Sequence, residues 1–159
     1  SRTKQGAGST LLTMVLEKLF QGLGMDRLEY LQQMPESMLL SVDVGHAYHP
    51  NYGDKMDPTN QSPLNTGFCI KEASSQSYAT DCRAVAIVEQ ICSQEEIPYT
   101  KFFNRSDGTG GSTLGSIASS FLPIPTVDGQ IGNNEIRLFQ IHKSDLGTEH
   151  IITFQSHSS

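Results

Sequence analysis

One stretch constrains the fold of this chain more than any other: residues 38–44, MLLSVDV, are apolar except for Ser41 and Asp43. A strand with one solvent-exposed face alternates between apolar and polar residues, whereas a strand covered on both faces is apolar almost throughout. The pattern therefore predicts an interior strand of a sheet that has helices on both sides, the arrangement of an α/β protein.

Helical and extended segments alternate around this strand, which supports an α/β fold with a sheet sandwiched between helices. Apolar residues that follow candidate capping residues predict two helices, from Ser9 or Thr10 to Gly22 or Gly24 and from Thr80 or Asp81 through 84–91. Two further helices are predicted over 26–33 and over 112–121. Three further strands are predicted: over 67–72, over 99–103, and near Thr126 and Val127. Because a strand, a helix and a strand follow one another over 67–103, we expect those two strands to be parallel.

The chain has 159 residues, enough for one domain with a real core. The residue pattern changes after Asp128. Residues 129–159 look like two strands of alternating apolar and polar residues joined by a polar turn. We therefore expect two parts: a domain over 1–128, and a divergent C-terminal segment over 129–159 that could add a β-hairpin to the sheet.

Charge and cysteine content exclude several classes of partner and site. The formal charge of −6, without a basic cluster longer than a pair, argues against nucleic acid or an anionic membrane surface. No apolar run approaches the roughly 18 residues of a membrane span. The odd number of cysteines and the lack of a CxxC spacing argue against a disulfide framework or a thiolate zinc site. A cytoplasmic protein with a small-molecule, peptide or protein partner fits these features.

Asp43 is out of place in an apolar strand, because a desolvated carboxylate must find a cation, a proton or several hydrogen-bond donors. At the carboxyl end of a parallel strand it would face the crevice in which open α/β sheets bind ligands. A divalent metal ion is one partner that fits. The other interpretation is a carboxylate that accepts hydrogen bonds from loop amides.

The predicted loop over 45–66 is long enough to indicate a function, and it begins with a segment that contains His46 and His49. Pro50 disfavours a helix at His49, so the two histidines need not share one metal ion. One or both would bind metal or a substrate carboxyl oxygen, or else they are loop histidines bonded to backbone groups.

The segment SDGTGGST, residues 106–113, precedes a predicted helix, and its backbone amides could hold an anion at the positive end of that helix. It lacks the lysine of a phosphate-binding loop. The alternative is an ordinary glycine-rich turn in which Asp107 is a turn residue and Ser112 is a cap. Cys82 and Cys92 share one predicted helix, where we expect a core role.

Several of these motifs together resemble one family. SRTKQGA, SVDVGHAYHPNYGDK, SYATD and NRSDGTGGSTLG with a downstream IPTVD resemble, in order and spacing, the aspartyl aminopeptidase family of two-zinc metalloaminopeptidases. The resemblance covers about residues 1–128 and implies the C-terminal part of an α/β catalytic domain. Members of the family remove N-terminal, typically acidic, residues from peptides. They carry an inserted dimerisation domain and assemble into large homo-oligomers, usually dodecamers.

The resemblance also implies roles for individual residues. Asp43 would be a carboxylate ligand of one of two zinc ions, and His46 would be catalytic by steadying the transition state. Zinc-activated water would attack the peptide substrate. The residues implied to contact substrate or to wall its pocket are His46, His49, Tyr78, Asp107, Gly110, Gly111, Ser112 and Thr113.

The chain departs from the family pattern in three places. The family's Glu-Glu pair, one histidine ligand and the bridging aspartate lie upstream of the stretch that matches Ser1. A Met-His-Ser ligand motif is missing after IPTVD, and His142 is the histidine most comparable to it as a metal ligand, although it comes several residues later. Thr66 stands where acidic-specific members tend to carry a lysine, so neutral N-terminal residues are a second interpretation of the specificity.

Three functional hypotheses follow. The first is part of a zinc aminopeptidase whose other ligands are encoded upstream, in which case the 159 residues alone are inactive. The second is a non-catalytic binding or assembly module derived from that fold, with residues 129–159 as its new element. The third is a chain whose residues after Asp128 have been replaced.

Overall fold

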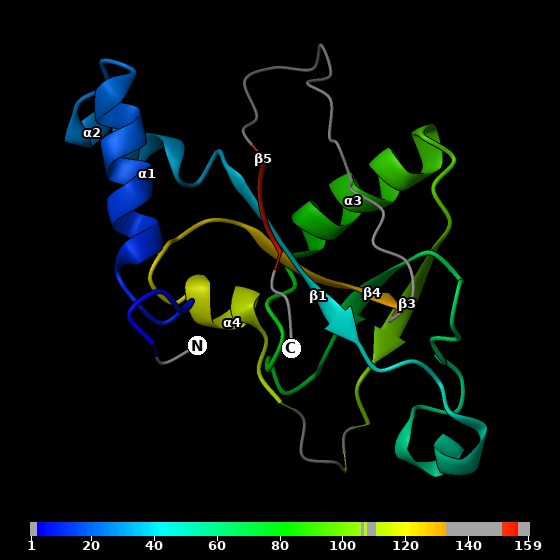
Figure 1. Ribbon diagram of the computed structural model, residues 1–159. Helices are drawn as coiled ribbons and strands as arrows, with labels where there is room; N and C mark the ends of the chain where they lie inside the picture. Colours follow the sequence, from blue (N-terminus) through cyan, green and yellow to red (C-terminus); the bar gives the residue numbers. More distant parts are fainter. Residues whose placement is uncertain (1–2, 106, 108–110, 133–150, 156–159) are drawn as a thin grey trace.

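Strand β1 (Met38–Gly45) lies in the interior of a five-stranded sheet, as its apolar sequence predicts. The computed structural model describes residues 3–105, 107, 111–132 and 151–155 (Figure 1). The strands have the order β3-β2-β4-β1-β5, so β1 has a neighbour on each edge. Residues 38–42 of β1 are all buried, which confirms that both faces of this strand are covered.

The other elements lie close to their predicted positions. The remaining strands are β2 (Phe68–Glu72), β3 (Tyr99–Phe103), β4 (Thr126–Gly132) and β5 (Ile151–Gln155). The helices are α1 (Leu11–Gly22), α2 (Arg27–Gln33), α3 (Cys82–Gln94) and α4 (Leu114–Ala118), with a 3-10 helix η1 (Pro50–Lys55) after β1. Within the part of the chain that the structure describes, no helix is long and apolar enough to cross a membrane.

Two of the helices begin at capping aspartates. The Asp26 carboxylate accepts from Glu29 N–H at 2.9 Å, and the Glu29 carboxylate accepts from Asp26 N–H at 2.7 Å, which forms a capping box at the start of α2. Asp81 starts α3 by accepting from the N–H groups of Arg83 and Ala84. The first N–H groups of a helix have no intrahelical acceptor, so these carboxylates set where the helices begin.

Helices cover both faces of the sheet, with α1, α2 and α4 on one side and α3 on the other (Figure 1). The core between α3 and the sheet consists of Met38, Leu40, Val42, Phe68, Ile70, Ala84, Val85, Val88, Cys92 and Val127. The core on the opposite face consists of Leu16, Phe20, Tyr30, Met34, Leu39, Ala118, Leu122 and Ile124. The two cores confirm the expected α/β sandwich.

One cysteine differs from its expected position. Cys92 is buried in the core under α3, as predicted, but Cys82 is exposed. Cys82 is the first residue of α3, directly after the capping Asp81. The first turn of a helix that starts at a surface turn can leave an apolar residue outside the core.

The directions of the strands were only partly predictable. β2 and β3 are parallel, as the intervening α3 requires. β1 is parallel to both β4 and β5, whereas β2 and β4 are antiparallel. The sheet is therefore mixed, a property that depends on how the connections cross it and not on the residues of any one strand.

Helix α4 is shorter than the predicted helix over 112–121. Serines in α4 and directly after it bond back to carbonyls three residues earlier: Ser116 Oγ donates to Thr113 O at 3.0 Å, and Ser120 Oγ donates to Ile117 O at 2.6 Å. Side-chain hydroxyls that bond to nearby carbonyls compete with helical hydrogen bonds. The regular helix ends at Ala118 and gives way to a turn.

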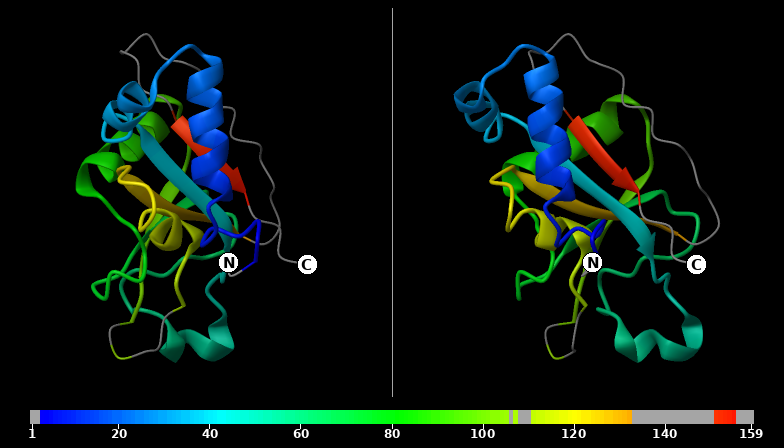
Figure 2. Two further views of the ribbon diagram at one scale, coloured as in Figure 1. Left: turned by 90° about the vertical axis from the view of Figure 1, so that its left-hand side faces the viewer. Right: turned by 60° about the vertical axis from the view of Figure 1, so that its left-hand side comes forward.

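The segment after Asp128 is continuous with the sheet. β4 runs through the boundary expected there and ends at Gly132. β5 pairs in parallel with residues 38–42 of β1, and Figure 2 shows the two strands side by side. The other strand of the predicted β-hairpin lies outside the described residues.

Candidate active-site surface

Four polar side chains of β1 and β4 share one face of the sheet, the face covered by α4. Ser41 is opposite Asp128, and Asp43 is opposite Gln130. Asp43 is near the carboxyl end of β1, where Figure 1 shows the chain leaving the sheet toward η1. Two interior strands therefore place carboxylates on the same face, with Asp128 two positions farther from the carboxyl end of β1 than Asp43 in the register of the sheet.

Asp43 is half-buried, and its Oδ1 accepts a hydrogen bond from Val44 N–H at 2.7 Å. This bond is of the kind that the second interpretation of Asp43, a carboxylate bonded to backbone amides, foresaw. It is also compatible with metal binding, because a carboxylate has about four acceptor positions. The charge of Asp43 acts on Lys71 of β2 as well.

Lys71 is a second charged residue in a buried strand, and sequence analysis missed it. Its side chain is partly buried, and its Nζ lies 5.0 Å from the centre of the Tyr78 ring. Burial lowers the pKa of Lys71, while the charges of Asp43 and Asp128 act in the opposite direction. The sequence FCIKE did contain a clue, because a lysine follows three buried apolar residues there.

Tyr78 lies in the connection between β2 and α3, at the position where the family resemblance places a pocket wall. Burial raises the pKa of the Tyr78 phenol, and the charge of Asp128 raises it further. A phenol with a raised pKa stays protonated at neutral pH and can donate a hydrogen bond. The structure therefore brings Tyr78 together with Lys71 and within electrostatic reach of Asp128.

Asp128 is only 1% exposed, and its carboxylate accepts three hydrogen bonds. Oδ2 accepts from Ala79 N–H at 2.7 Å and from the Thr113 hydroxyl, and Oδ1 accepts from Gly115 N–H at 3.1 Å. In the sequence, Asp128 is noted as the end of the IPTVD motif and as a boundary, and no role at the site is predicted for it. An aspartate next to buried Val127 carries the same clue as Asp43, a carboxylate in an apolar setting.

The two histidines of the loop lie beyond the end of β1. His46 is exposed. His49 is exposed too, its Nδ1 accepts from Asn51 N–H at 3.2 Å at the start of η1, and its ring lies 5.2 Å from that of Tyr52. For His49 the structure supports the interpretation of a loop histidine bonded to the backbone, with Nε2 as the nitrogen able to face a ligand.

Asp107 is paired with a neighbouring arginine. Arg105 Nε donates to Asp107 Oδ1 at 2.8 Å, Arg105 Nη2 donates to Oδ2 at 2.5 Å, and Arg105 Nη1 donates to the Asp54 carbonyl of η1. The bond to Arg105 holds the pKa of Asp107 below its ordinary value, and the same bond raises the pKa of Arg105. Arg105 thus ties the glycine-rich segment to η1.

The rest of the glycine-rich segment is only partly described. Gly110 lies outside the described residues, Gly111 and Ser112 are exposed, and Thr113 is buried. The N-cap of α4 is Thr113, not Ser112, because the helix starts at Leu114. With a helix of five residues behind it, this segment fits the ordinary-turn interpretation better than an anion cradle.

The described residues do not complete a metal site. No group of three or more His, Cys, Asp and Glu side chains among them could hold a metal ion. His142, the second predicted ligand, lies outside the described residues. Asp43 is therefore one carboxylate of suitable chemistry without a full ligand set around it in this part of the chain.

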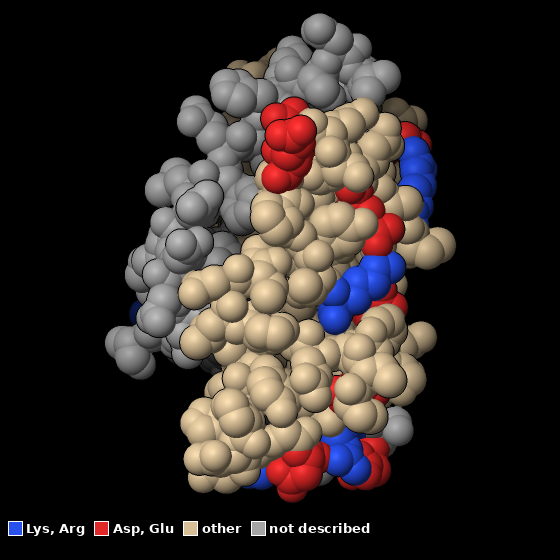
Figure 3. Space-filling view, turned by 90° about the vertical axis from the view of Figure 1, so that its right-hand side faces the viewer, with Lys and Arg blue, Asp and Glu red and all other residues tan. Residues whose placement is uncertain are grey.

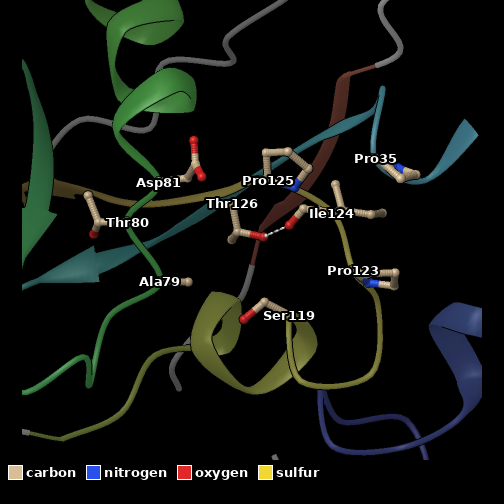
Figure 4. Close-up of a pocket in the computed structure, with 9 residues that line it drawn as sticks. All are labelled: Pro35, Ala79, Thr80, Asp81, Ser119, Pro123, Ile124, Pro125 and Thr126. Carbon is tan, nitrogen blue, oxygen red and sulfur yellow. Dashed lines mark hydrogen bonds between the residues drawn. The ribbon is translucent and has the colours of Figure 1, made fainter.

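A hollow of about 430 Å³ lies at the other end of the strands (Figure 4). It is lined by Pro35, Ala79, Thr80, Asp81, Ser119, Pro123, Ile124, Pro125 and Thr126. Thr126 begins β4, so the hollow opens near the amino end of that strand, whereas Asp43 is near the carboxyl end of β1. Asp81 is the one titratable residue of this lining, and its carboxylate caps α3.

Charges of both signs are mixed on the face shown in Figure 3, with wide neutral areas between them. One lysine of the described residues, Lys101 of β3, is paired with two carboxylates, because its Nζ lies 2.8 Å from Glu89 and 3.6 Å from Glu72. The hydrogen bond to Glu89 raises the pKa of Lys101. This face presents no broad basic surface among the described residues.

Comparison with known proteins relates most of the chain to one group of enzymes. The family described as "Aminopeptidase I zinc metalloprotease (M18)" matches residues 1–150. A probable M18 family aminopeptidase 2 of Clostridium novyi (strain NT) is 45% identical over 128 residues, which make up 80% of this chain and 30% of that protein. The chain thus spans about 30% of the length of the curated relatives that it matches.

Solved structures show the same relationship. A cryo-EM structure of the complex of Ape4 and Nbr1 matches with a TM-score of 0.77 and 32% identity, covering 82% of this chain and 25% of that chain. The structure of the S. cerevisiae mApe1 dodecamer matches with a TM-score of 0.69 and 25% identity, covering 83% of this chain and 28% of that one. The family match ends at residue 150, so it continues beyond Asp128 but stops before β5.

Proposed function

Because the chain belongs to the aminopeptidase I zinc metalloprotease family (M18), we propose that it is the C-terminal part of the catalytic domain of a zinc aminopeptidase. The reaction would be the removal of N-terminal residues, acidic ones in particular, from peptides. The position of Asp43 carries this proposal. It is a carboxylate near the carboxyl end of an interior strand, in electrostatic contact with partly buried Lys71, where open α/β sheets bind ligands.

Asp43 would supply one ligand to a two-zinc centre. A half-buried carboxylate suits zinc, but a catalytic zinc takes about three protein ligands, and the described residues offer no such group. The remaining ligands would come from outside those residues, with His142 as a candidate in this chain. When bound, zinc polarises the scissile carbonyl and lowers the pKa of the attacking water.

The chain's own residues would bind and orient the peptide. Lys71 presents an ammonium in a partly buried setting, which suits the carboxylate of an N-terminal aspartate or glutamate. The Tyr78 ring beside that ammonium would keep it directed toward the substrate. Thr66 donates to the Pro63 carbonyl at 2.8 Å and stays within its own turn. We therefore assign the acidic preference to Lys71 and not to position 66.

The exposed residues beyond β1 would complete the site. His46 follows Asp43 by three residues and would donate to the oxygen that becomes negative in the transition state. His49 would contact substrate through Nε2, since Nδ1 accepts from the Asn51 amide. The rest of the pocket wall would be formed by Tyr78, Asp107, Gly110, Gly111, Ser112 and Thr113.

The longer protein would act as a homo-oligomer. A related aminopeptidase, S. cerevisiae mApe1, forms a dodecamer, and a family member of the same architecture would assemble in a similar way. We also propose a cytoplasmic setting, because Cys69, Cys82 and Cys92 are free thiols and a reducing compartment keeps thiols free.

A non-catalytic binding or assembly module derived from the same fold is the second candidate. One observation favours it: the described residues contain no group that could hold a metal ion. A module of this kind would neither bind zinc tightly nor hydrolyse peptides in any length of the protein. The aminopeptidase proposal expects the same inactivity of these 159 residues alone, but activity in a longer protein that contains them.

Zinc calorimetry and hydrolysis of Asp- and Leu-p-nitroanilide separate the two candidates. The aminopeptidase proposal predicts weak zinc binding and no turnover for this chain, and turnover for the longer protein. In the longer protein, Asp43→Asn should abolish turnover, because an amide oxygen is a far weaker zinc ligand than a carboxylate. Lys71→Met should reduce hydrolysis of the Asp substrate much more than that of the Leu substrate.

Asp57→Asn is the matched control for Asp43→Asn. Asp57 is also a partly buried aspartate, in the connection between β1 and β2, but its carboxylate accepts from Thr59 and Asn60 within one turn. The control should retain full activity. Full activity of Asp43→Asn, or turnover and tight zinc binding by this chain alone, would refute the assigned role of Asp43.

A further inference from the structure

The carboxylate of Asp128 joins segments that are far apart in the sequence. Ala79, which donates to Oδ2, is 49 residues away, and Thr113 and Gly115 are 15 and 13 residues away. The backbone takes part too, because Asp128 N–H donates to Ala79 O at 3.0 Å. Ala79 adjoins Tyr78, and Thr113 ends the glycine-rich segment, so both segments belong to the proposed pocket wall.

The Thr113 hydroxyl bonds to Asp128 and does not cap the helix that it precedes. A threonine at an N-cap usually accepts from an N–H of the first helical turn through its side chain. Thr113 is the N-cap of α4, yet its side chain makes no capping bond there and donates to Asp128 instead. One N–H group of the first turn of α4 has its acceptor outside the helix, since Gly115 N–H donates to Asp128.

The packing around Asp128 leaves no room for adjustment. A Cβ built at Gly115 would lie 2.3 Å from Asp128 Oδ1 and 2.9 Å from Ser41 Cβ. Only glycine allows α4 to come this close to β1 and β4. A buried carboxylate with three donors is well compensated, and charged acceptors make the stronger kind of hydrogen bond, so the three segments are held at a fixed separation.

From this geometry we propose that Asp128 is a positioning residue, which holds the segment of Tyr78 and Ala79 against the start of α4 and thereby keeps Tyr78 over Lys71. The inference rests on the proposed function, because it takes Lys71 and Tyr78 to be part of a peptide pocket. Asp128 itself would not touch substrate, since it is buried under the residues that it holds.

Asp128→Asn is the most informative variant because it keeps the shape and removes one acceptor. An asparagine side chain has one oxygen, whereas donors approach both oxygens of Asp128. Whichever way the amide is oriented, its NH₂ faces either Gly115 N–H or the pair of Ala79 N–H and the Thr113 hydroxyl. At least one of these donors therefore loses its acceptor.

The experiment is amide hydrogen exchange and NMR of the ¹⁵N-labelled 159-residue chain. We expect the exchange protection of the Ala79 or Gly115 amide to fall about tenfold relative to Leu39, with shifted Tyr78 ring resonances. Leu39 is a residue of β1 whose N–H donates to Pro125 O, and its exchange reports the stability of the whole fold. If the substitution only lowered the stability of the fold and did not move the segment of Tyr78 and Ala79, the exchange protection of the Ala79, Gly115 and Leu39 amides would fall together. The Tyr78 ring resonances would then be unchanged.

Asp81→Asn is the matched control. Asp81 lies in the same connection between β2 and α3 as Ala79, but its carboxylate accepts from the first N–H groups of α3. Its effects should be confined to the first amides of α3. If Asp128→Asn does not fold, Thr113→Val tests the same idea, since it removes one donor and keeps the carboxylate.

Unchanged relative protection and an unchanged Tyr78 ring in the folded Asp128→Asn variant would overturn the inference, as would an unchanged ring in Thr113→Val. These readouts need neither zinc nor peptide. Failure of the inference is therefore distinguishable from failure of the proposed function, which is judged by turnover in the longer protein.

Discussion

Gly115→Ala tests most directly how closely α4 approaches the sheet. The added Cβ would lie 2.3 Å from Asp128 Oδ1 and 2.9 Å from Ser41 Cβ, closer than real Cβ atoms come to other heavy atoms. Neither neighbour can turn aside, because Ser41 Cβ is attached to the backbone of β1 and the Asp128 carboxylate is held by three hydrogen bonds. Helix α4 must move away from the sheet.

Three terms set the size of the effect. Overpacking a tight contact costs about 1–3 kcal/mol. Weakening the bond from Gly115 N–H to a charged acceptor costs up to about 1.5–3 kcal/mol. The higher helix propensity of alanine compared with glycine stabilises the fold by about 1 kcal/mol. The expected net loss in the free energy of unfolding is about 2–4 kcal/mol, or about 5–15 °C in Tm for a domain of this size.

Urea unfolding followed by far-UV circular dichroism measures this loss, and Gly22→Ala is its matched control. Gly22 is the last residue of α1, and nothing lies within 4 Å of a Cβ built there. The same chemical change should leave stability equal or raise it by up to about 1 kcal/mol. If Gly115→Ala proves as stable as Gly22→Ala, the close approach of α4 to β1 and β4 is wrong.

Three further predictions concern the core, a helix cap and an ion pair. Ile70→Ala, at a fully buried position, should cost about 2–5 kcal/mol in urea unfolding, and a cost no larger than that of Leu28→Ala, at a position 63% exposed, would contradict the described core. Asp81→Ala should cost about 1 kcal/mol and Asp81→Asn much less, since asparagine also caps; equal losses would argue against the cap. Arg105→Gln should raise the pKa of Asp107 toward its ordinary value, because Arg105 holds it lower. Because the pKa of Asp107 is lowered, the ion pair stabilises the fold at pH values above the ordinary aspartate pKa, and this effect is lost as the pH falls through the lowered value. The Asp107 carboxyl can be titrated by ¹³C NMR, and the same midpoint in Arg105→Gln as in the unchanged chain would contradict the ion pair.

The elements that sequence analysis predicted best are those whose information is local. The burial of residues 38–42 follows from their apolar run, and the start of α3 follows from the capping residue Asp81. Helix α4 was overestimated because its serines bond back to carbonyls of their own turn. That competition involves side-chain geometry that spacing alone does not reveal.

The candidate site was predicted in part. Asp43 was found because a carboxylate is costly in an apolar strand, and the same argument applied to FCIKE would have found Lys71. Asp128 was harder to recognise, since its donors lie 49, 15 and 13 residues away in the chain. The position of His49 as a cap of η1 depends on the turn that follows it.

By itself the sequence determined the interior position of β1, the starts of α2 and α3, and the presence of one misplaced carboxylate, because these depend on the periodicity and caps of single elements. Only the tertiary structure decided that β2 runs against β4, that β5 pairs with β1, and that Asp128 joins the segments beside Tyr78 and Gly115. These depend on which distant segments pack against each other, and no local pattern contains that choice.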